Sequence, residues 1–154
     1  MEHRYTREEE TAAERLDRNY AELLQELRVA QTGVQILFAF LLTIAFQQRF
    51  PALTRYEHTL YVIALVLATA SAILLIAPSA AHRVLFGRHR KDEIVTYAAR
   101  LAVAGLACLA FAILAAVLFT LTVVVNGVFA VWTSVGLFVL LALCWLVFPW
   151  VGRA

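Results

Sequence analysis

Four long stretches of this sequence contain almost no charged residue, and this feature restricts the fold more than any motif does. Residues 29–46, 61–77, 97–125 and 128–150 hold no aspartate, glutamate or lysine, and Arg100 is their single charged side chain. An α-helix needs about 20 apolar residues to cross a hydrocarbon core of about 30 Å. With 62% hydrophobic and 16% charged residues, the chain also has too little polar surface for a soluble domain.

The sequence therefore predicts an all-α fold, a polytopic membrane protein with four transmembrane helices of which the first is extended into the cytosol. Residues 1–28 are expected to form a cytosolic amphipathic helix continuous with the first span, and residues 29–154 to form a four-helix transmembrane domain. The expected spans cover about residues 29–48, 57–78, 95–125 and 128–150.

Residues 6–50 read as one helix with a polar stripe along it. At 100° per residue, an apolar seam that includes Tyr20, Leu27 and Val34 points to one side, and the stripe occupies a separate sector about 80° wide. The stripe keeps its direction from the charged half into the apolar half, so both halves belong to one rod. Its members are Gln25, Arg28, Thr32, Gln35, Ala39, Thr43 and Phe46.

Local signals predict where the helices begin and end. Residues 6–9 and 54–57 each place a threonine three residues before a glutamate, a pair that can satisfy free amides at a helix N-terminus. Pro51 is expected to stop the first helix, and Pro78 to end or kink the second, because proline lacks an amide hydrogen. Asn126 and the glycine after it predict a turn.

Small residues recur every four positions in the second and third spans, which predicts faces that approach a neighbouring helix closely. Both cysteines lie in apolar runs and are interpreted as buried small hydrophobic residues, not as a disulfide or metal pair. The small positions are Ala64, Ala68 and Ala72 in the second span and Ala104, Cys108, Ala112 and Ala116 in the third; the other cysteine is Cys144.

The basic residues predict that both termini face the cytosol. Most of them lie in the N-terminal segment, in a basic loop at residues 82–93 and at Arg153, whereas the opposite connections hold only Arg49 and Arg55. The N-terminal helix and the basic loop then share one side, where exposed pairs worth about 0–1 kcal/mol each would fix how they dock. The candidates for this docking are Glu14, Asp17, Glu22, Arg83, Arg88, Arg90 and Lys91.

The apolar seam of the N-terminal helix calls for a partner. We expect it to pack on the cytosolic loop of its own chain or on a second copy. A helix lying on the membrane surface is the alternative, but residues 1–30 hold eight acidic residues, which anionic lipid repels.

No template for catalysis occurs in the sequence. There is no glycine-rich phosphate loop, no histidine pair at metal spacing and no nucleophile elbow. Ser71, Ser79 and Ser134 are interpreted as packing or capping residues, and His82 and His89 as solvated loop residues. We therefore expect no enzymatic activity, catalytic residue, cofactor, metal site or nucleic-acid partner.

Several segments resemble an actinobacterial family of small four-span membrane proteins of unknown function. The similarity covers nearly the whole chain, is most specific in residues 22–42, and includes residues 76–78, 82–83 and 90–93. It implies a location in the bacterial cytoplasmic membrane. Some members of that family carry the label sodium/proton antiporter, so the resemblance also implies this activity.

The residues favour a passive path over antiport. An antiporter exchanges a proton on a membrane-embedded group, normally a carboxylate, and the expected spans contain none. Gln35 lies at the depth where such a carboxylate is expected, but an amide cannot carry the proton.

The polar stripe leaves two interpretations, because facing amides and an arginine toward lipid costs several kcal/mol. In one, the stripe bonds to the other spans or to a neighbouring subunit, and the chain is a non-conducting structural or regulatory subunit. In the other, several copies line a water-filled path, with Gln35 and Thr43 as polar rings, Ala39 as a narrow point and Arg28 as a cytosolic ring. We predict the second, a homo-oligomeric passive channel for an inorganic ion or small solute.

Overall fold

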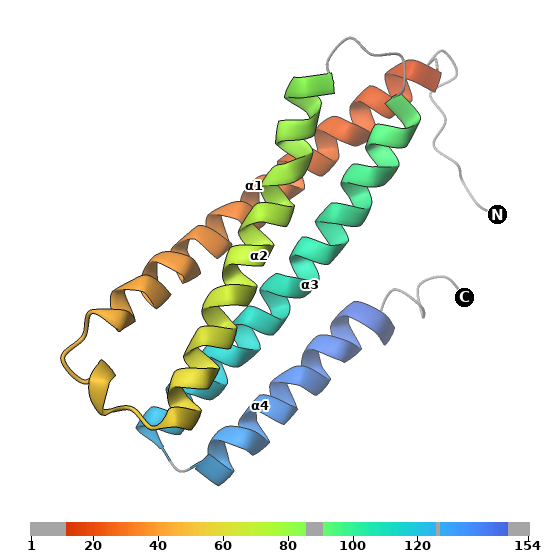
Figure 1. Ribbon diagram of the computed structural model, residues 1–154. Helices are drawn as coiled ribbons and strands as arrows, with labels where there is room; N and C mark the ends of the chain where they lie inside the picture. The colour runs from red at the N-terminus through yellow and green to blue at the C-terminus, as the bar shows by residue number, and fades with distance from the viewer. Residues whose placement is uncertain (1–11, 86–90, 126, 148–154) are drawn as a thin grey trace.

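The structure is a computed structural model that describes residues 12–85, 91–125 and 127–147, and these residues form four helices that run alternately up and down (Figure 1). All four are long and apolar enough to cross a membrane, which confirms the predicted all-α membrane fold. A short 3₁₀ turn, η1, precedes the second helix, and a π-helical turn, η2, follows the fourth. The elements are α1 (Ala12–Ala45), η1 (Phe50–Ala52), α2 (Arg55–Leu85), α3 (Lys91–Val124), α4 (Gly127–Ala142) and η2 (Leu143–Val147).

The first helix is a single rod of 34 residues, as the constant direction of the stripe predicted. Its buried side chains, Tyr20, Leu27, Val34 and Leu41, are only 1–6% exposed and lie seven residues apart on the predicted seam. A seven-residue repeat keeps one face of a helix turned toward its partner when the two helices wrap gently around each other. This seam packs α1 mainly against α2 and, less extensively, against α3.

The α2–α3 pair forms the centre of the molecule and has the most extensive helix interface. Ala64, Ala68 and Ser71 of α2 are completely buried, and Ser71 Oγ donates a hydrogen bond of 2.8 Å to the carbonyl oxygen of Gly105 in α3. A Cβ atom on Gly105 would lie 2.8 Å from the side chain of Leu75. Small residues therefore bring these two backbones together, as membrane helix packing requires.

The buried face of α3 differs from the predicted one. Ala112 is fully buried as expected, but Ala104 is exposed, and Cys108 and Ala116 are only half-buried. A four-residue row turns about 40° around a helix at each step, whereas a seven-residue row turns back by only about 20°, so the four-residue row leaves the contact. From residue 96 onward, where the side chains of α3 are described, the buried positions are Ala98, Ala102, Gly105, Ala110, Ala112 and Phe119.

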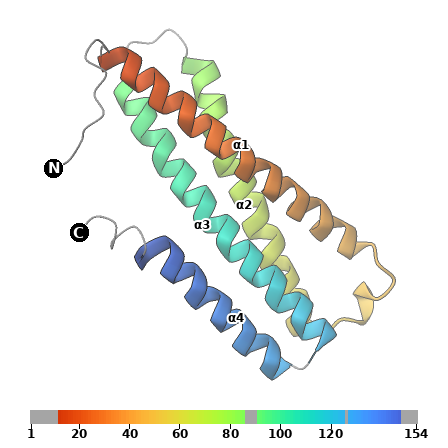
Figure 2. The ribbon, with the colours of Figure 1, turned by 180° about the vertical axis from the view of Figure 1, so that it is seen from behind.

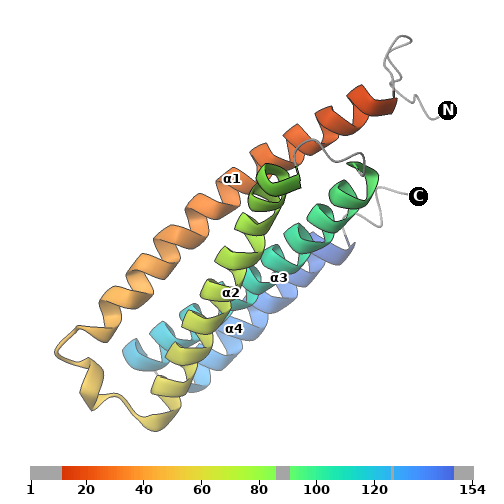
Figure 3. The same cartoon turned by 45° about the horizontal axis from the view of Figure 1, so that its top comes forward.

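The fourth helix is peripheral. α1 and α4 flank opposite sides of the α2–α3 pair (Figure 1, Figure 2 and Figure 3). α4 packs mainly on α3, where the rings of Phe111 and Phe138 stack with their centroids 6.4 Å apart. Ala130 is the only buried residue of α4 in the described part of the chain. Cys144 was predicted to be buried but is exposed; it lies in η2, which continues this peripheral helix.

The helix ends agree only in part with the predicted signals. α1 ends at Ala45, before the expected stop at Pro51, which instead lies in η1. α2 continues through Pro78 to Leu85, so this proline does not end the helix. α2 and α3 also occupy both ends of the predicted basic loop, while the predicted cap at residues 6–9 and the turn residue Asn126 lie outside the described residues.

The predicted cap at the start of α2 is confirmed. The backbone N–H and the hydroxyl of Thr54 donate to Glu57 Oε2 at 2.7 and 2.9 Å, and the N–H of Glu57 donates to Thr54 Oγ1 at 3.3 Å. Each side chain thus satisfies an amide that the helix itself leaves without a partner.

Replacing Thr54 with alanine is expected to lower the free energy of unfolding by about 1 kcal/mol, because the N–H of Glu57 loses its acceptor. Thermal unfolding of the purified protein in detergent measures this change. Thr59→Ala is the matched control, since that hydroxyl donates only to the carbonyl of Arg55 in its own helix. Equal unfolding temperatures for T54A and T59A would contradict a stabilising role for the cap.

Candidate functional site

The polar stripe lies on the outer surface of the protomer. No other described helix covers it, because α1 turns its seam of buried side chains toward α2 and α3 and leaves the stripe on the opposite part of its circumference. Sequence periodicity therefore placed these residues together on one exposed surface. All seven predicted members are exposed: Gln25, Arg28, Thr32, Gln35, Ala39, Thr43 and Phe46.

Helix geometry gives the depth of each stripe residue. The connection after Ala45 joins α1 to α2 at one end of the bundle (Figure 1), and the depths below are counted from this end. At 1.5 Å per residue, Gln35 lies about 15 Å from that end, near the middle of a hydrocarbon core of about 30 Å. Arg28 lies about 25 Å from the same end, close to the opposite surface. The arginine can therefore reach headgroups or water, whereas the amide cannot.

Two hydroxyls of the stripe are satisfied inside α1. Thr32 Oγ1 donates to the carbonyl oxygen of Arg28 at 3.0 Å, and Thr43 Oγ1 donates to that of Ala39 at 2.9 Å. These bonds use the i–4 carbonyls of the same helix, so neither hydroxyl requires a partner from outside the protomer.

The amide of Gln35 has no such partner. It is exposed, and it makes no side-chain hydrogen bond to any residue that the structure describes. A primary amide left unpaired in hydrocarbon costs several kcal/mol. In a membrane, Gln35 therefore requires either water or a polar group from another molecule.

Other polar side chains of α1 and α2 hold the two helices together, and the sequence interpretation did not identify them. Each one donates to a backbone carbonyl across the interface, and two of the acceptors lie at or just before Pro78. A backbone carbonyl oxygen has two lone pairs, so it can accept a side-chain hydrogen bond beside its own helical bond. The three bonds are Tyr20 Oη to Pro78 O at 2.8 Å, Gln31 Nε2 to Leu75 O at 2.7 Å, and Tyr61 Oη to Leu41 O at 3.1 Å.

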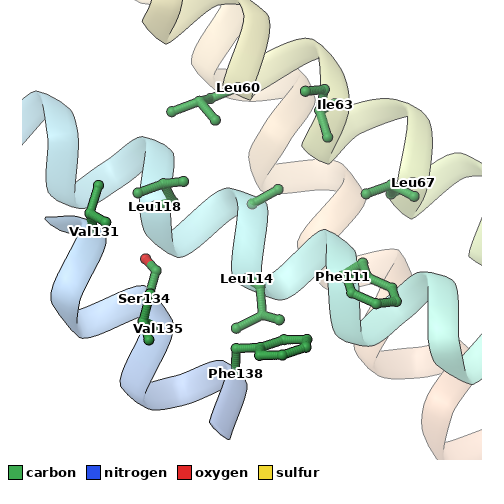
Figure 4. Close-up of a pocket in the computed structure, with 11 residues that line it drawn as sticks. Leu60, Ile63, Leu67, Phe111, Leu114, Leu118, Val131, Ser134, Val135 and Phe138 are labelled. Atoms are coloured by element: carbon green, nitrogen blue, oxygen red, sulfur yellow. The ribbon is translucent and has the colours of Figure 1, made fainter. Parts of the chain in front are cut away.

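A second feature is an apolar groove of about 460 Å³ between α2, α3 and α4 (Figure 4). Leu60 and Ile63 of α2 form one wall, α3 contributes Leu114, and α4 forms the other wall. Ser134 is the only polar side chain in the lining, and its Oγ is buried with no hydrogen-bond partner in the described part of the chain. The sequence predicted a packing or capping role for this serine, but the structure leaves its hydroxyl unpaired in the groove.

The predicted charge docking is not described by the structure. Glu14 and Glu22 are exposed on α1. The side chains of the other candidates, or the residues themselves, lie outside the described residues, so this docking remains a prediction. These candidates are Asp17, Arg83, Arg88, Arg90 and Lys91.

Comparison with known proteins identifies a family but supplies no activity. Residues 9–149 match the family of unknown function DUF6328, which confirms the expected relationship to a family of unknown function. No curated protein and no solved structure matches the chain.

Proposed function

We propose a function for this chain, which belongs to the family of unknown function DUF6328, from the geometry of its polar stripe. Several copies assemble in the membrane and turn their stripes toward a shared axis, where they form a passive path for an inorganic ion or small solute. The protein is placed by this proposal in the bacterial cytoplasmic membrane, with both termini in the cytosol. The lipid bilayer and further copies of the same chain are its partners.

The unpaired amide of Gln35 is the observation that carries the proposal. If every uncovered side of α1 faced lipid, the protein would be more stable in the bilayer with leucine than with glutamine at this depth. An amide there is compatible with the bilayer when water or another polar group meets it, and a shared axis supplies both. In such a path Gln35 and Thr43 form polar rings, Ala39 forms a narrow point and Arg28 forms a ring at the cytosolic mouth.

The sequence also favours passive movement over sodium/proton exchange. Exchange requires a group that gains and loses a proton within the membrane. The four apolar stretches contain no acidic side chain at all. A ring of amides can hydrate a permeating species but cannot couple its movement to a proton.

One observation supports a non-conducting structural or regulatory subunit as the second candidate. The hydroxyls of Thr32 and Thr43 are already satisfied within α1, so Gln35 is the one stripe side chain at mid-membrane depth that still needs a partner. Amides from adjacent copies can bond to one another, which would lock the subunits together and close the axis.

Cysteine accessibility distinguishes the two candidates. In a background carrying Cys108→Ala and Cys144→Ala, a cysteine at Gln35 is expected to react with a membrane-impermeant thiol reagent, because water reaches the thiolate. Ile36→Cys is the control at the same depth, since Ile36 is exposed on an adjacent part of α1. Equal labelling at 35 and 36, or none at 35, would contradict a water-filled path. Flux of small ions and solutes into proteoliposomes then measures conduction directly.

A further inference from the structure

We infer that the proposed path selects inorganic anions over cations, and that the ring of Arg28 side chains sets this selectivity. The inference rests on the proposed function and adds the substrate class to it. Rings of arginine or lysine side chains favour anions in pores, whereas rings of aspartate or glutamate favour cations. The sign of the charge nearest to the shared axis therefore decides which ions enter the path.

Arg28 points in nearly the same direction as Gln35. The two residues are seven positions apart, which places their side chains about 20° apart around α1 and about 10 Å apart along it. Both are exposed, and Arg28 makes no side-chain hydrogen bond or ion pair with any residue that the structure describes. An assembly that turns the amide of Gln35 toward water at a shared axis therefore turns the guanidinium of Arg28 toward the same water.

The two acidic residues closest to Arg28 in the sequence lie on another side of α1. Residues 19–46 hold three charged side chains, Glu22, Glu26 and Arg28, and all three are exposed. At 100° per residue, Glu22 and Glu26 lie about 120° and 160° around the helix from Arg28. They are therefore turned away from the stripe, and Arg28 is the one charged member of the stripe.

The other acidic residues of α1 lie far from Arg28 along the helix. Glu14 and Asp17 are about 21 and 16 Å nearer to the N-terminus at 1.5 Å per residue. These distances are about two Debye lengths or more at physiological salt, where charges in water are largely screened from one another. Neither position is close enough to cancel the charge of an arginine ring.

The opposite mouth of the path also has a net positive charge. Its one acidic residue is Glu57, whose carboxylate accepts hydrogen bonds from the backbone N–H and the hydroxyl of Thr54. Residues 124–128, the other connection at this end, hold no charged residue. This mouth therefore does not attract cations in preference to anions. The charged residues of the connection between α1 and α2 and of the first turn of α2 are Arg49, Arg55 and Glu57.

Between the two mouths the stripe is neutral and does not choose the sign of an ion. The amide of Gln35 offers both N–H donors and a carbonyl acceptor, so it can hydrate either an anion or a cation. The hydroxyls of Thr32 and Thr43 already donate to carbonyl oxygens of α1. The positive ring therefore decides, because a charge of one sign at a narrow mouth raises the local concentration of the opposite ion.

The electrical potential across proteoliposomes that hold a KCl gradient tests the inference. In vesicles of phosphatidylcholine, which carries no net charge, the sign of the potential reports whether chloride or potassium crosses faster, whichever way the protein is inserted. Chloride is expected to permeate about tenfold faster than potassium. Faster passage of potassium, or passage of uncharged solutes alone, would overturn anion selectivity and leave the proposed path intact. Absence of any flux would overturn both.

Substitutions at Arg28 test whether this residue sets the selectivity. Arg28→Gln removes no side-chain contact within the described protomer and is expected to lower the ratio of chloride to potassium permeability about tenfold. Arg28→Glu should invert the ratio, and Arg28→Lys should keep it, since the charge is kept.

Glu26→Gln is the matched control for these substitutions. It changes the charge of the same helix by one unit, two residues from Arg28 but on the other side of α1, and is expected to leave the ratio within about twofold of its original value. Native mass and circular dichroism of each variant report assembly and folding separately from selectivity. An unchanged ratio in R28Q, or a change in E26Q as large as that in R28Q, would overturn the assignment of selectivity to Arg28.

Discussion

Replacing Gly105 with leucine is expected to abolish the folded protein, whereas Gly105→Ala should fold with a free energy of unfolding about 1–3 kcal/mol lower. The first added carbon would already lie 2.8 Å from Leu75 and 3.2 Å from the Cβ atom of Leu74. Leu75 is completely buried, so it cannot move aside without displacing the residues packed around it. A leucine side chain would push α2 and α3 apart and break the bond from Ser71 to the carbonyl of Gly105.

The yield of monodisperse protein in detergent and its unfolding temperature measure this effect. Gly136→Leu provides the comparison, because it makes the same change in residue type where nothing lies within 4 Å. Both substitutions raise helix propensity by about 1 kcal/mol, so the difference between them isolates packing. A G105L protein as stable as G136L would contradict the close approach of α2 and α3.

The sequence predicted the packing of the amphipathic helix α1 better than that of the other helices. In α1, charged and amide side chains contrast with leucine and valine, so periodicity identified both the seam and the exposed stripe. Tyr20, Leu27, Val34 and Leu41 are all buried on the predicted side. The cap formed by Thr54 was also predictable, because it depends on two side chains three residues apart.

The packing face of α3 was harder to predict from the sequence. Residues 101–119 of α3 are all apolar or glycine, so hydrophobicity does not distinguish the protein side of this stretch from its lipid side, and only residue size does. Alanine is too frequent in this helix to mark one row. The row through Ala104 was therefore chosen by a four-residue spacing, whereas packing follows the seven-residue spacing from Ala98 to Gly105 and Ala112.

Contacts between distant residues could not be predicted from periodicity. The bond from Gln31 to Leu75 depends on the relative alignment of α1 and α2, which no spacing within either helix contains. The available signal was Gln31 itself, a polar residue beside the apolar seam. The apolar groove is similar, since it forms where α4 packs on α3 and leaves Ile63 of α2 exposed on that side.

Leucine at Gln35 is expected to reduce flux through the proposed path at least tenfold while leaving the helices folded. The side chain has no hydrogen bond to other described residues of its own chain, so its replacement removes no contact within the protomer. A ring of leucines at mid-membrane depth is dry, and a narrow apolar constriction blocks ions by losing its water. Proteoliposome flux and native mass, measured on the same preparation, follow conduction and assembly separately.

The two readouts together decide between the proposed roles of the stripe. Loss of flux with an intact oligomer would support an amide ring that holds water, whereas loss of the oligomer would support amides that bond copy to copy and close the axis. Gln25→Leu is the control, because it makes the same exchange on the stripe beyond Arg28, outside the hydrocarbon core, and should change neither readout. Unchanged flux and assembly in Q35L would contradict both roles, because each role gives the amide a polar partner whose loss must change one of the two readouts. An exposed amide without such a partner would only destabilise the protein in lipid.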